Sequence, residues 1–343
     1  MSNLSGDIPI IDLSPWTQGD SDDPNLEAAK TRVSKEIFDA FCSIGFIVVI
    51  NHGIPGDQPD GTGGLTERAF AASQSFFELD KEAKLKFRYL SPESNRGYIA
   101  MGQEKLDGDL SDIKETFDIG FEGEKAFQNR WPEGTEIHDH FKETMLTYFR
   151  EYDKLHLIIL RALARGMGFD CDDYFTPLCN ANHQNLRLLH YPECDREAIA
   201  NGQKRGGIHT DYGTITLVAQ NGVSGLVAQK INGDWCSVPP IPGGIAVNVG
   251  EMLQRWSNDI LRATPHQILD DDPLNKDAAK SDRVPERYSI AFFCNANKDT
   301  SLECLPVCQS ADRPPRYEPI NAFDYITKRL TDTIPVMKPA VAM

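Results

Sequence analysis

The sequence lacks any hydrophobic run that could cross a bilayer, because no stretch reaches the roughly 18–20 apolar residues that a membrane-spanning helix needs. Residues 1–7 also lack the basic and apolar segments of a secretory signal peptide. From these two absences we expect a cytoplasmic protein that has no membrane partner.

Positive charge and paired cysteines are scarce as well. The 343 residues include 35 Lys and Arg against 51 Asp and Glu, giving a formal net charge of −16 that would repel nucleic-acid backbones and anionic membranes. No CxxC pair occurs, and Cys304 and Cys308, the closest two of eight cysteines, have no matching His/Cys pair. Reduced thiols are therefore expected. The expected partner is a small-molecule substrate, and the expected assembly is a monomer or a weak homo-oligomer.

The first half of the chain contains mainly helical patterns. Apolar residues at helical spacing predict helices over residues 26–44, 65–79 and 138–167. Short runs rich in β-branched and aromatic residues predict strands over residues 8–14, 46–50, 96–100 and 115–121. The first of these strands contains a proline, which suits a strand at the edge of a sheet.

The pattern changes at Asn185, where short strands begin to recur at roughly eight to twelve residues, as in β sandwiches and barrels. They are expected over residues 185–191, 214–220, 225–229, 235–238, 245–249, 266–269 and 288–294, and a closing helix over 321–330. The predicted fold class is α+β. Its parts are an N-terminal helical and strand region at 1–180, a double-stranded β-helix (jelly-roll) core at 181–320, and a C-terminal helix and tail at 321–343.

One motif in this core suggests a metal site. His209 and Asp211 are two positions apart between glycines, so in an extended segment their side chains project from the same face. An imidazole and a carboxylate are two of the three ligands in the 2-His-1-carboxylate triad, which leaves open positions on iron. Because His-x-Asp alone is a weak signal, a third ligand is needed from elsewhere in the chain.

His266 is the best candidate for that ligand, since it begins an alternating apolar segment far along the sequence. The remaining histidines lie in a turn, in a polar loop, on predicted helices, or, in one case, next to Leu189 on a predicted strand. We interpret them as structural or solvated residues: His52, His138, His140, His156, His183 and His190.

A second motif suggests an anion site. Arg287 and Ser289 share one face of a predicted strand, so that a guanidinium and a hydroxyl could bind one end carboxylate of a dicarboxylate. Tyr191 could add a phenolic donor from an opposite strand. By itself, an Arg-x-Ser pair more often lies on the protein surface.

Together these motifs resemble the iron(II)/2-oxoglutarate-dependent dioxygenases of the isopenicillin N synthase-like family. The resemblance extends to an IPIIDL opening at residues 8–13, a GFIVVINHGI segment at 45–54, and Asn248-Val-Gly250 followed by Trp256-Ser-Asn258. It covers nearly the whole chain. It implies that His209, Asp211 and His266 hold Fe(II), and that Arg287, Ser289 and Tyr191 bind the co-substrate 2-oxoglutarate. It also implies that O2 drives the oxidation of a substrate, by default a hydroxylation, with release of succinate and CO2.

Within this family the chain resembles the thymine 7-hydroxylases. The similarity lies in residues 185–192, 209–213, 255–258 and 287–295, and it implies that a pyrimidine is held by Arg187, Tyr212, Phe293 and Asn295. Related oxygenases of secondary metabolism share this framework, so an aromatic secondary metabolite is the alternative substrate, with desaturation or ring rearrangement as alternative outcomes. Glu251 stands where the family commonly has Asp, at a position expected to lie clear of the iron site.

Three other functions remain open from sequence. A zinc hydrolase could use the same three ligands with a metal-bound water, although Arg287 and Ser289 would then have no role. A relative could use iron without 2-oxoglutarate. A non-catalytic jelly-roll binding protein would not need the complete triad.

Overall fold

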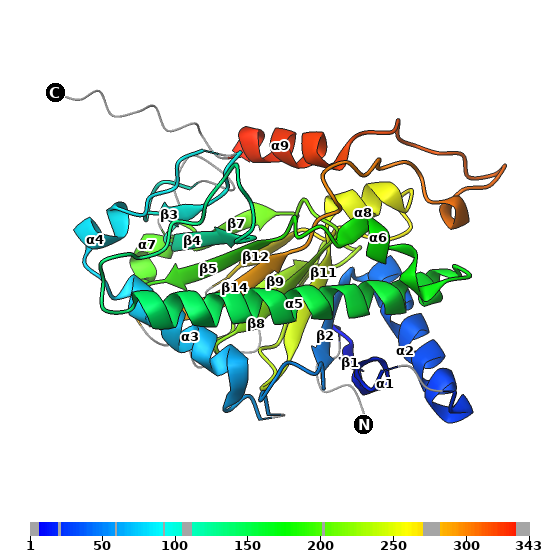
Figure 1. Ribbon diagram of the computed structural model, residues 1–343, viewed down its shortest axis with the longest axis horizontal. Helices are drawn as coiled ribbons and strands as arrows, with labels where there is room; N and C mark the ends of the chain where they lie inside the picture. Colours follow the sequence, from blue (N-terminus) through cyan, green and yellow to red (C-terminus); the bar gives the residue numbers. More distant parts are fainter. Residues whose placement is uncertain are drawn as a thin grey trace.

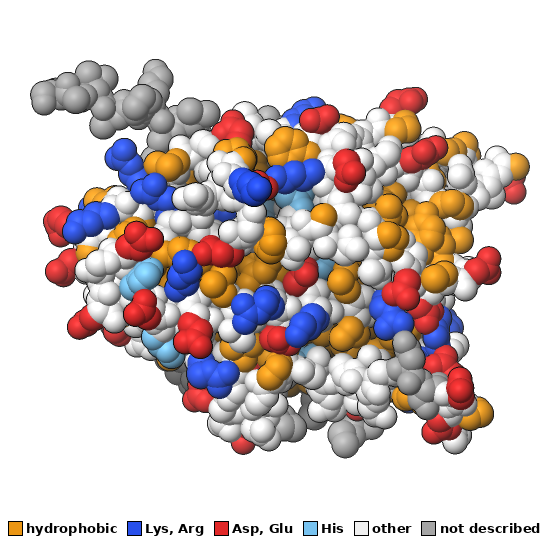
Figure 2. All heavy atoms as spheres, viewed as in Figure 1, with side chains coloured by type: hydrophobic (Ala, Val, Ile, Leu, Met, Phe, Trp, Pro, Cys, Tyr) orange, Lys and Arg blue, Asp and Glu red, His pale blue; other side chains and the backbone are white. Residues whose placement is uncertain are grey.

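The structure is a computed structural model that describes residues 7–19, 22–58, 60–91, 93–104, 112–200, 203–269 and 282–333. Two β-sheets form its centre, and a long helix lies across one side of them (Figure 1). On the face shown in Figure 2, acidic and basic side chains are interspersed. Among the helices of the described residues, none is both long and apolar enough to cross a membrane.

The larger sheet has eight strands. In spatial order they are β1 (Ile10–Asp12), β2 (Phe46–Ile50), β11 (Ile245–Val249), β8 (Ile215–Gln220), β14 (Arg287–Phe293), β5 (Asn185–Tyr191), β4 (Glu115–Gly120) and β3 (Gly97–Ile99). β1 pairs with β2 in parallel and lies at the edge, while the pairs from β2 to β3 are antiparallel. Strands of the N-terminal half therefore extend the core sheet at both ends.

The smaller sheet has four strands, in the order β10 (Trp235–Ser237), β9 (Leu226–Gln229), β12 (His266–Ile268) and β7 (Gly206–His209). β12 and β7 are antiparallel, and their register places His266 directly opposite His209. A separate ladder joins β13 (Arg283–Val284) to β6 (Cys194–Asp195).

Helices cover one face of the large sheet. α5 (His138–Met167) packs against α2 (Pro24–Ser43) and α3 (Gly64–Phe77), as Figure 1 shows. Its apolar stripe reaches the sheet through Phe149 and Tyr152, whose rings lie 5.0 Å and 6.0 Å from Phe292 of β14. α5 ends at Gly168, whose φ of 85° is the left-handed conformation that glycine adopts without strain. The long stripe therefore supports the sheet, as the sequence predicts.

Short elements complete the fold. They are α1 (Ser14–Thr17), α4 (Lys81–Leu85), α6 (Thr176–Cys179), α7 (Arg196–Ala200), α8 (Glu251–Trp256), α9 (Ala322–Thr333) and the 3-10 turns Asp172–Tyr174 and Pro306–Cys308. All eight cysteines are free. The division of the chain at residues 180 and 320 stays a prediction.

Candidate active site

A cavity of about 160 Å³ lies between the two sheets. Strand alternation determines which side chains line it. Along β14, residues 287, 289, 291 and 293 line the cavity, whereas Tyr288, Ile290 and Phe292 join the hydrophobic core under the helices. β5 and β8 alternate in the same way, so the large sheet forms a core on one face and the cavity wall on the other.

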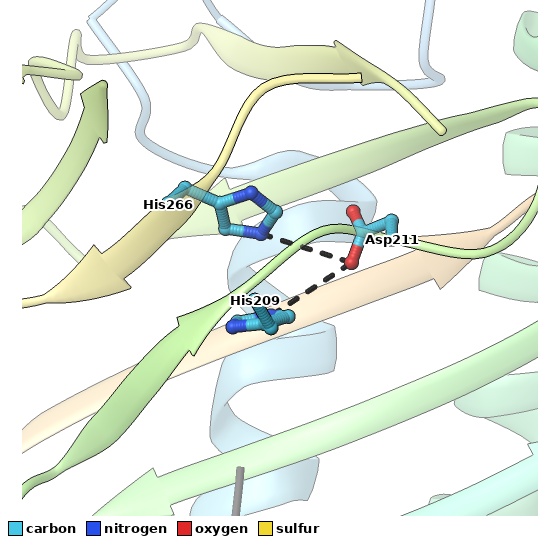
Figure 3. Close-up of side chains that lie close together, drawn as sticks. All are labelled: His209, Asp211 and His266. Carbon is cyan, nitrogen blue, oxygen red and sulfur yellow. Dashed lines mark ion pairs between the residues drawn. The ribbon is translucent and has the colours of Figure 1, made fainter. Parts of the chain in front are cut away.

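His209, Asp211 and His266 meet in this cavity (Figure 3). One possible ligand atom from each residue lies within 4.8 Å of the other two. The Nε2 atoms of His209 and His266 are 3.9 Å and 3.7 Å from Oδ1 of Asp211. His209 and Asp211 do not share a strand, contrary to the prediction from sequence, because β7 ends at His209 and Asp211 lies in the irregular segment that follows.

Hydrogen bonds hold the remaining polar atoms of these three residues. Nδ1 of His209 lies 2.8 Å from the carbonyl oxygen of Gly207, and Nδ1 of His266 lies 3.0 Å from that of Thr264. A carbonyl only accepts, so each Nδ1 carries a proton, and Nε2 of a neutral ring then offers its lone pair to a metal. Asn248 donates to Oδ2 of Asp211 at 2.7 Å, which leaves Oδ1 available. Two imidazole nitrogens and one carboxylate oxygen are thus prepared as ligands, and this donor set fits Fe(II).

The charge states of the group favour a cation. Desolvation, together with the neighbouring His266, lowers the pKa of His209 to about 4, so its imidazole is neutral at pH 7. Burial alone would raise the pKa of Asp211, but the two imidazoles and the Asn248 amide lower it below its usual value. At neutral pH the site therefore combines the neutral imidazole of His209 with the negative charge of Asp211, beside the second imidazole at His266.

Arg287, Ser289 and Tyr191 lie together on the large-sheet side of the same cavity. Arg287 is 1% exposed and donates from Nη1 to Ser289 Oγ at 3.1 Å and from Nη2 to Gln220 Oε1 at 3.1 Å. Its guanidinium carbon lies 5.1 Å from the ring centre of Tyr191, which is the cross-strand partner of Arg287. The structure thus brings together a buried guanidinium and two hydroxyls, which suits a carboxylate.

The four residues predicted to bind substrate also line this cavity: Arg187, Tyr212, Phe293 and Asn295. Three N–H groups of Arg187 are engaged, two by Asp118 at 2.8 Å and 2.9 Å and one by Glu104 at 2.9 Å. The five N–H donors of a guanidinium exceed these three bonds, so Arg187 can still donate to a ligand.

Sequence reasoning missed two charged residues in the cavity wall. Lys114 is buried and forms ion pairs with Glu104 at 3.1 Å and with Asp112 at 2.9 Å. Glu104 in turn joins Lys114 to Arg187. Both lie between two predicted strands in a segment that the sequence shows only as acidic, and no local pattern indicates that it folds into the cavity wall.

Glu251 contacts the candidate metal site, contrary to expectation. Its backbone N–H donates to the carbonyl oxygen of Asp211 at 2.7 Å, and its carboxylate accepts from Thr210 Oγ1 at 2.5 Å. Because Thr210 lies between His209 and Asp211, Glu251 helps to hold the backbone between these two side chains.

Comparison with known proteins identifies the family. Residues 182–296 match the 2OG-Fe(II) oxygenase superfamily, and residues 8–134 match the N-terminal region of non-haem dioxygenases in morphine synthesis. Over 316 residues the chain is 33% identical to the 2-oxoglutarate-Fe(II) type oxidoreductase ppzD of Metarhizium rileyi, covering 87% of this chain and 85% of that protein. The chain belongs to the 2OG-Fe(II) oxygenase superfamily.

Other members of the superfamily are similar over most of the chain. The proline hydroxylase buaE of Petromyces alliaceus is 33% identical, with 87% of this chain and 92% of that protein covered. A crystal structure of full-length Neurospora crassa thymine 7-hydroxylase in complex with alpha-KG and thymine has a TM-score of 0.84 and 38% identity, with 95% of this chain and 96% of that chain covered. These similarities confirm the predicted family and the jelly-roll fold.

As a 2OG-Fe(II) oxygenase, the protein is a 2-oxoglutarate-dependent dioxygenase that uses Fe(II), 2-oxoglutarate and O2. Family membership favours this description over the zinc hydrolase and the non-catalytic binding protein.

Proposed function

We propose that the protein hydroxylates a C–H group of a small flat cyclic substrate. His209, Asp211 and His266 hold Fe(II), while Arg287, Ser289 and Tyr191 bind 2-oxoglutarate. One observation carries this proposal: three prepared ligand atoms and a buried guanidinium with two hydroxyls face the same cavity. The two groups come from opposite sheets, so a co-substrate between them would contact both.

Each side of the cavity has a separate task in this mechanism. When bound, Fe(II) supplies the chemistry that couples O2 and 2-oxoglutarate to C–H oxidation, with release of succinate and CO2. Arg287 and Ser289 bind and orient the far carboxylate of 2-oxoglutarate through charge-assisted hydrogen bonds. Three ligands on one face leave positions open for reactants. Apolar side chains from the wall, including Phe293, Ile326 and Leu330, exclude water.

The substrate is either a pyrimidine such as thymine or an aromatic secondary metabolite. The similarity to the Neurospora crassa thymine 7-hydroxylase, solved with thymine, supports the first, and the similarity to fungal oxygenases of secondary metabolism supports the second. In either case Phe293 supplies an aromatic face, while Arg187, Tyr212 and Asn295 supply hydrogen-bonding groups around a planar ring.

An anaerobic titration tests the metal and co-substrate assignments. Adding Fe(II) and 2-oxoglutarate without oxygen should produce a visible metal-to-ligand charge-transfer band. His209→Ala should weaken or abolish this band and abolish succinate formation, because one of three ligands is lost. The apo-protein of this variant should keep its melting temperature, since His209 is partly exposed and has one backbone contact. A wild-type protein that forms no band would refute the proposal.

The substrate is tested by succinate release. Thymine and a set of aromatic secondary metabolites should be added to the Fe(II)-loaded protein with 2-oxoglutarate and O2, and products should be analysed by mass. A gain of one oxygen atom supports hydroxylation, whereas a loss of two hydrogens would show desaturation instead.

A further inference from the structure

A second cavity of about 260 Å³ adjoins the active-site cavity. The two cavities share five lining residues, here called the neck: Asn95, Asn185, Asn295, Ile326 and Leu330. Each cavity alone is smaller than the roughly 300 Å³ at the lower end of ligand pockets, and the inner one must also hold the co-substrate. A substrate that extends through the neck would use both spaces.

The neck contains two buried hydrogen-bond acceptors that no donor reaches among the residues described. They are the Oδ1 atoms of Asn95 and Asn185. Nδ2 of Asn185 donates a hydrogen bond to the backbone carbonyl of Asn95 at 3.0 Å. This bond fixes the orientation of the Asn185 amide, so that its oxygen is the atom without a partner. A buried acceptor without a donor has lost its hydrogen bonds to water and gained none in return, so both atoms are suited to a ligand that supplies donors.

The residue after Asn95 in the chain carries a buried donor that has no acceptor among the described residues. Arg96 follows Asn95 in the chain and lines the second cavity, and its Nη1 donates to the carbonyls of Ser94 and Asn95 at 3.0 Å and 2.9 Å. Its Nε is buried, with no acceptor among the part of the chain that is described. The guanidinium lies against Gly120, where a Cβ would approach Nη2 to 1.6 Å, and Gly120 pairs with Asn185 between β4 and β5.

The charges around the second cavity do not favour an anion. Arg96 and Lys298 line it together with Glu93, Glu124 and Asp299, and Lys298 pairs with Glu124 at 2.6 Å. Burial also lowers the pKa of the lining His183 to about 4, so this histidine adds no positive charge at pH 7. A neutral ligand that carries both donors and an acceptor fits better than a carboxylate.

We propose that the neck binds an amide or lactam group of the substrate. An N–H of this group donates to Oδ1 of Asn95, and its carbonyl accepts from Nε of Arg96. Where the molecule has a second N–H, as thymine does, that N–H donates to Oδ1 of Asn185. The carbon that is oxidised lies in the inner cavity, and the rest of the molecule extends into the second cavity. This inference rests on the proposed function, because it defines the chemical class of the substrate that is oxidised in the inner cavity.

Binding of matched N–H and N-methyl compounds tests this inference. The probes are thymine and the cyclic dipeptide of proline and glycine, each beside its fully N-methylated form. Binding of each probe should be measured by isothermal titration calorimetry on the full chain, anaerobically, with and without Fe(II) and 2-oxoglutarate. We expect at least one N–H form to bind about tenfold or more tightly than its methylated form.

Substitutions at Asn95 locate the effect. Asn95 has a φ of 45°, so Asn95→Gly removes the side chain while the backbone remains favourable, and Asn95→Asp keeps an acceptor oxygen. Asn95→Gly should reduce the ratio of binding between the N–H probe and its N-methylated form by several fold, and Asn95→Asp should retain this ratio. Asn51→Gly, at a φ of 53° away from the neck, is the matched control and should leave the preference unchanged.

Three results would overturn the inference: equal binding of both forms, an undiminished preference in Asn95→Gly, or no binding of either N–H probe. These outcomes are distinct from failure of the proposed function. A missing charge-transfer band with Fe(II) and 2-oxoglutarate would refute that function. Binding of the probes can be measured whether or not this band forms.

Discussion

Each residue of the proposed iron triad has one polar atom engaged by the protein and another facing its neighbours. Backbone carbonyls fix Nδ1 of His209 and His266, and Asn248 fixes Oδ2 of Asp211. These bonds set tautomer and orientation before any metal arrives, which lowers the entropy cost of binding. The three ligand residues could be predicted from sequence. The groups that hydrogen-bond to their other polar atoms could not, because these bonds depend on tertiary contacts.

Arg287→Lys should weaken 2-oxoglutarate binding. Lysine cannot reproduce the planar fork that contacts Ser289, Gln220 and the carbonyl of Val223, and its ammonium is a compact point charge. Loss of a charge-assisted hydrogen bond of about 1.5–3 kcal/mol predicts a KM for 2-oxoglutarate raised roughly ten- to a hundredfold. At saturating co-substrate, kcat should fall much less.

Steady-state kinetics at varied 2-oxoglutarate would measure this change. Lys154→Arg, at an exposed position of α5, is the control, because it exchanges the same two residue types in the opposite direction. An unchanged KM in Arg287→Lys would contradict the role assigned to Arg287.

At the scale of elements, the carboxylate of Glu251 joins α9 to the segment that follows β7. Glu251, at the start of α8, accepts from Tyr325 Oη at 2.8 Å and from two nitrogens of Arg329 at 2.8 Å and 2.7 Å, in addition to Thr210. Arg329 also lies 4.5 Å above the ring of Tyr212. Since Ile326 and Leu330 of α9 line the cavity, this contact holds one cavity wall against the residues that carry the triad.

Glu251→Gln should loosen α9. An amide cannot accept the same set of charge-assisted bonds, so we expect a loss of about 1–3 kcal/mol in the free energy that docks the helix. Limited proteolysis should then cleave near residues 322–333 faster than in the wild-type protein. Glu303→Gln, at an exposed position, is the control. Equal cleavage rates in Glu251→Gln and wild type would show that the helix is held mainly by apolar packing.

The elements that sequence predicts well are those with long or regular patterns. The bounds of α5 agree with the expected 138–167, because its apolar stripe is continuous and Gly168 ends it. β5 likewise matches 185–191. The helices α4 and α8 were not expected, since five or six residues carry too little periodicity. α8 was missed for this reason, and with it the position of Glu251 beside Thr210.

At the scale of the molecule, buried charges in the cavity wall link stability to pH. Burial alone would raise the pKa of Glu104, but Arg187 and Lys114 lower it to about 2 from the ordinary 4.5. A depressed carboxyl pKa contributes stability that is present above pH 4.5 and is lost as the pH falls towards 2. The whole fold should therefore weaken in acid through this group.

Glu104→Gln tests this linkage. The fall in the pKa of Glu104 from 4.5 to about 2 corresponds to a loss on the order of 3 kcal/mol in the free energy of unfolding at pH 7. The difference in this free energy between Glu104→Gln and wild type should narrow between pH 4.5 and pH 2. Urea unfolding at several pH values would measure it, with the exposed Glu143→Gln as control. A difference that is independent of pH would show that Glu104 acts through packing rather than through its charge.

The direct pairing of His209 with His266 across β7 and β12 has a consequence for the apo-protein. An ion held by both rings would cross-link neighbouring strands that are far apart in the sequence, much as a disulfide closes a long loop. Amide hydrogens of the small sheet should then exchange more slowly when iron is supplied, whereas those of α5 should change little. A cell short of iron would hold a less rigid and more protease-sensitive form, so the supply of the metal would control the lifetime of the enzyme as well as its activity.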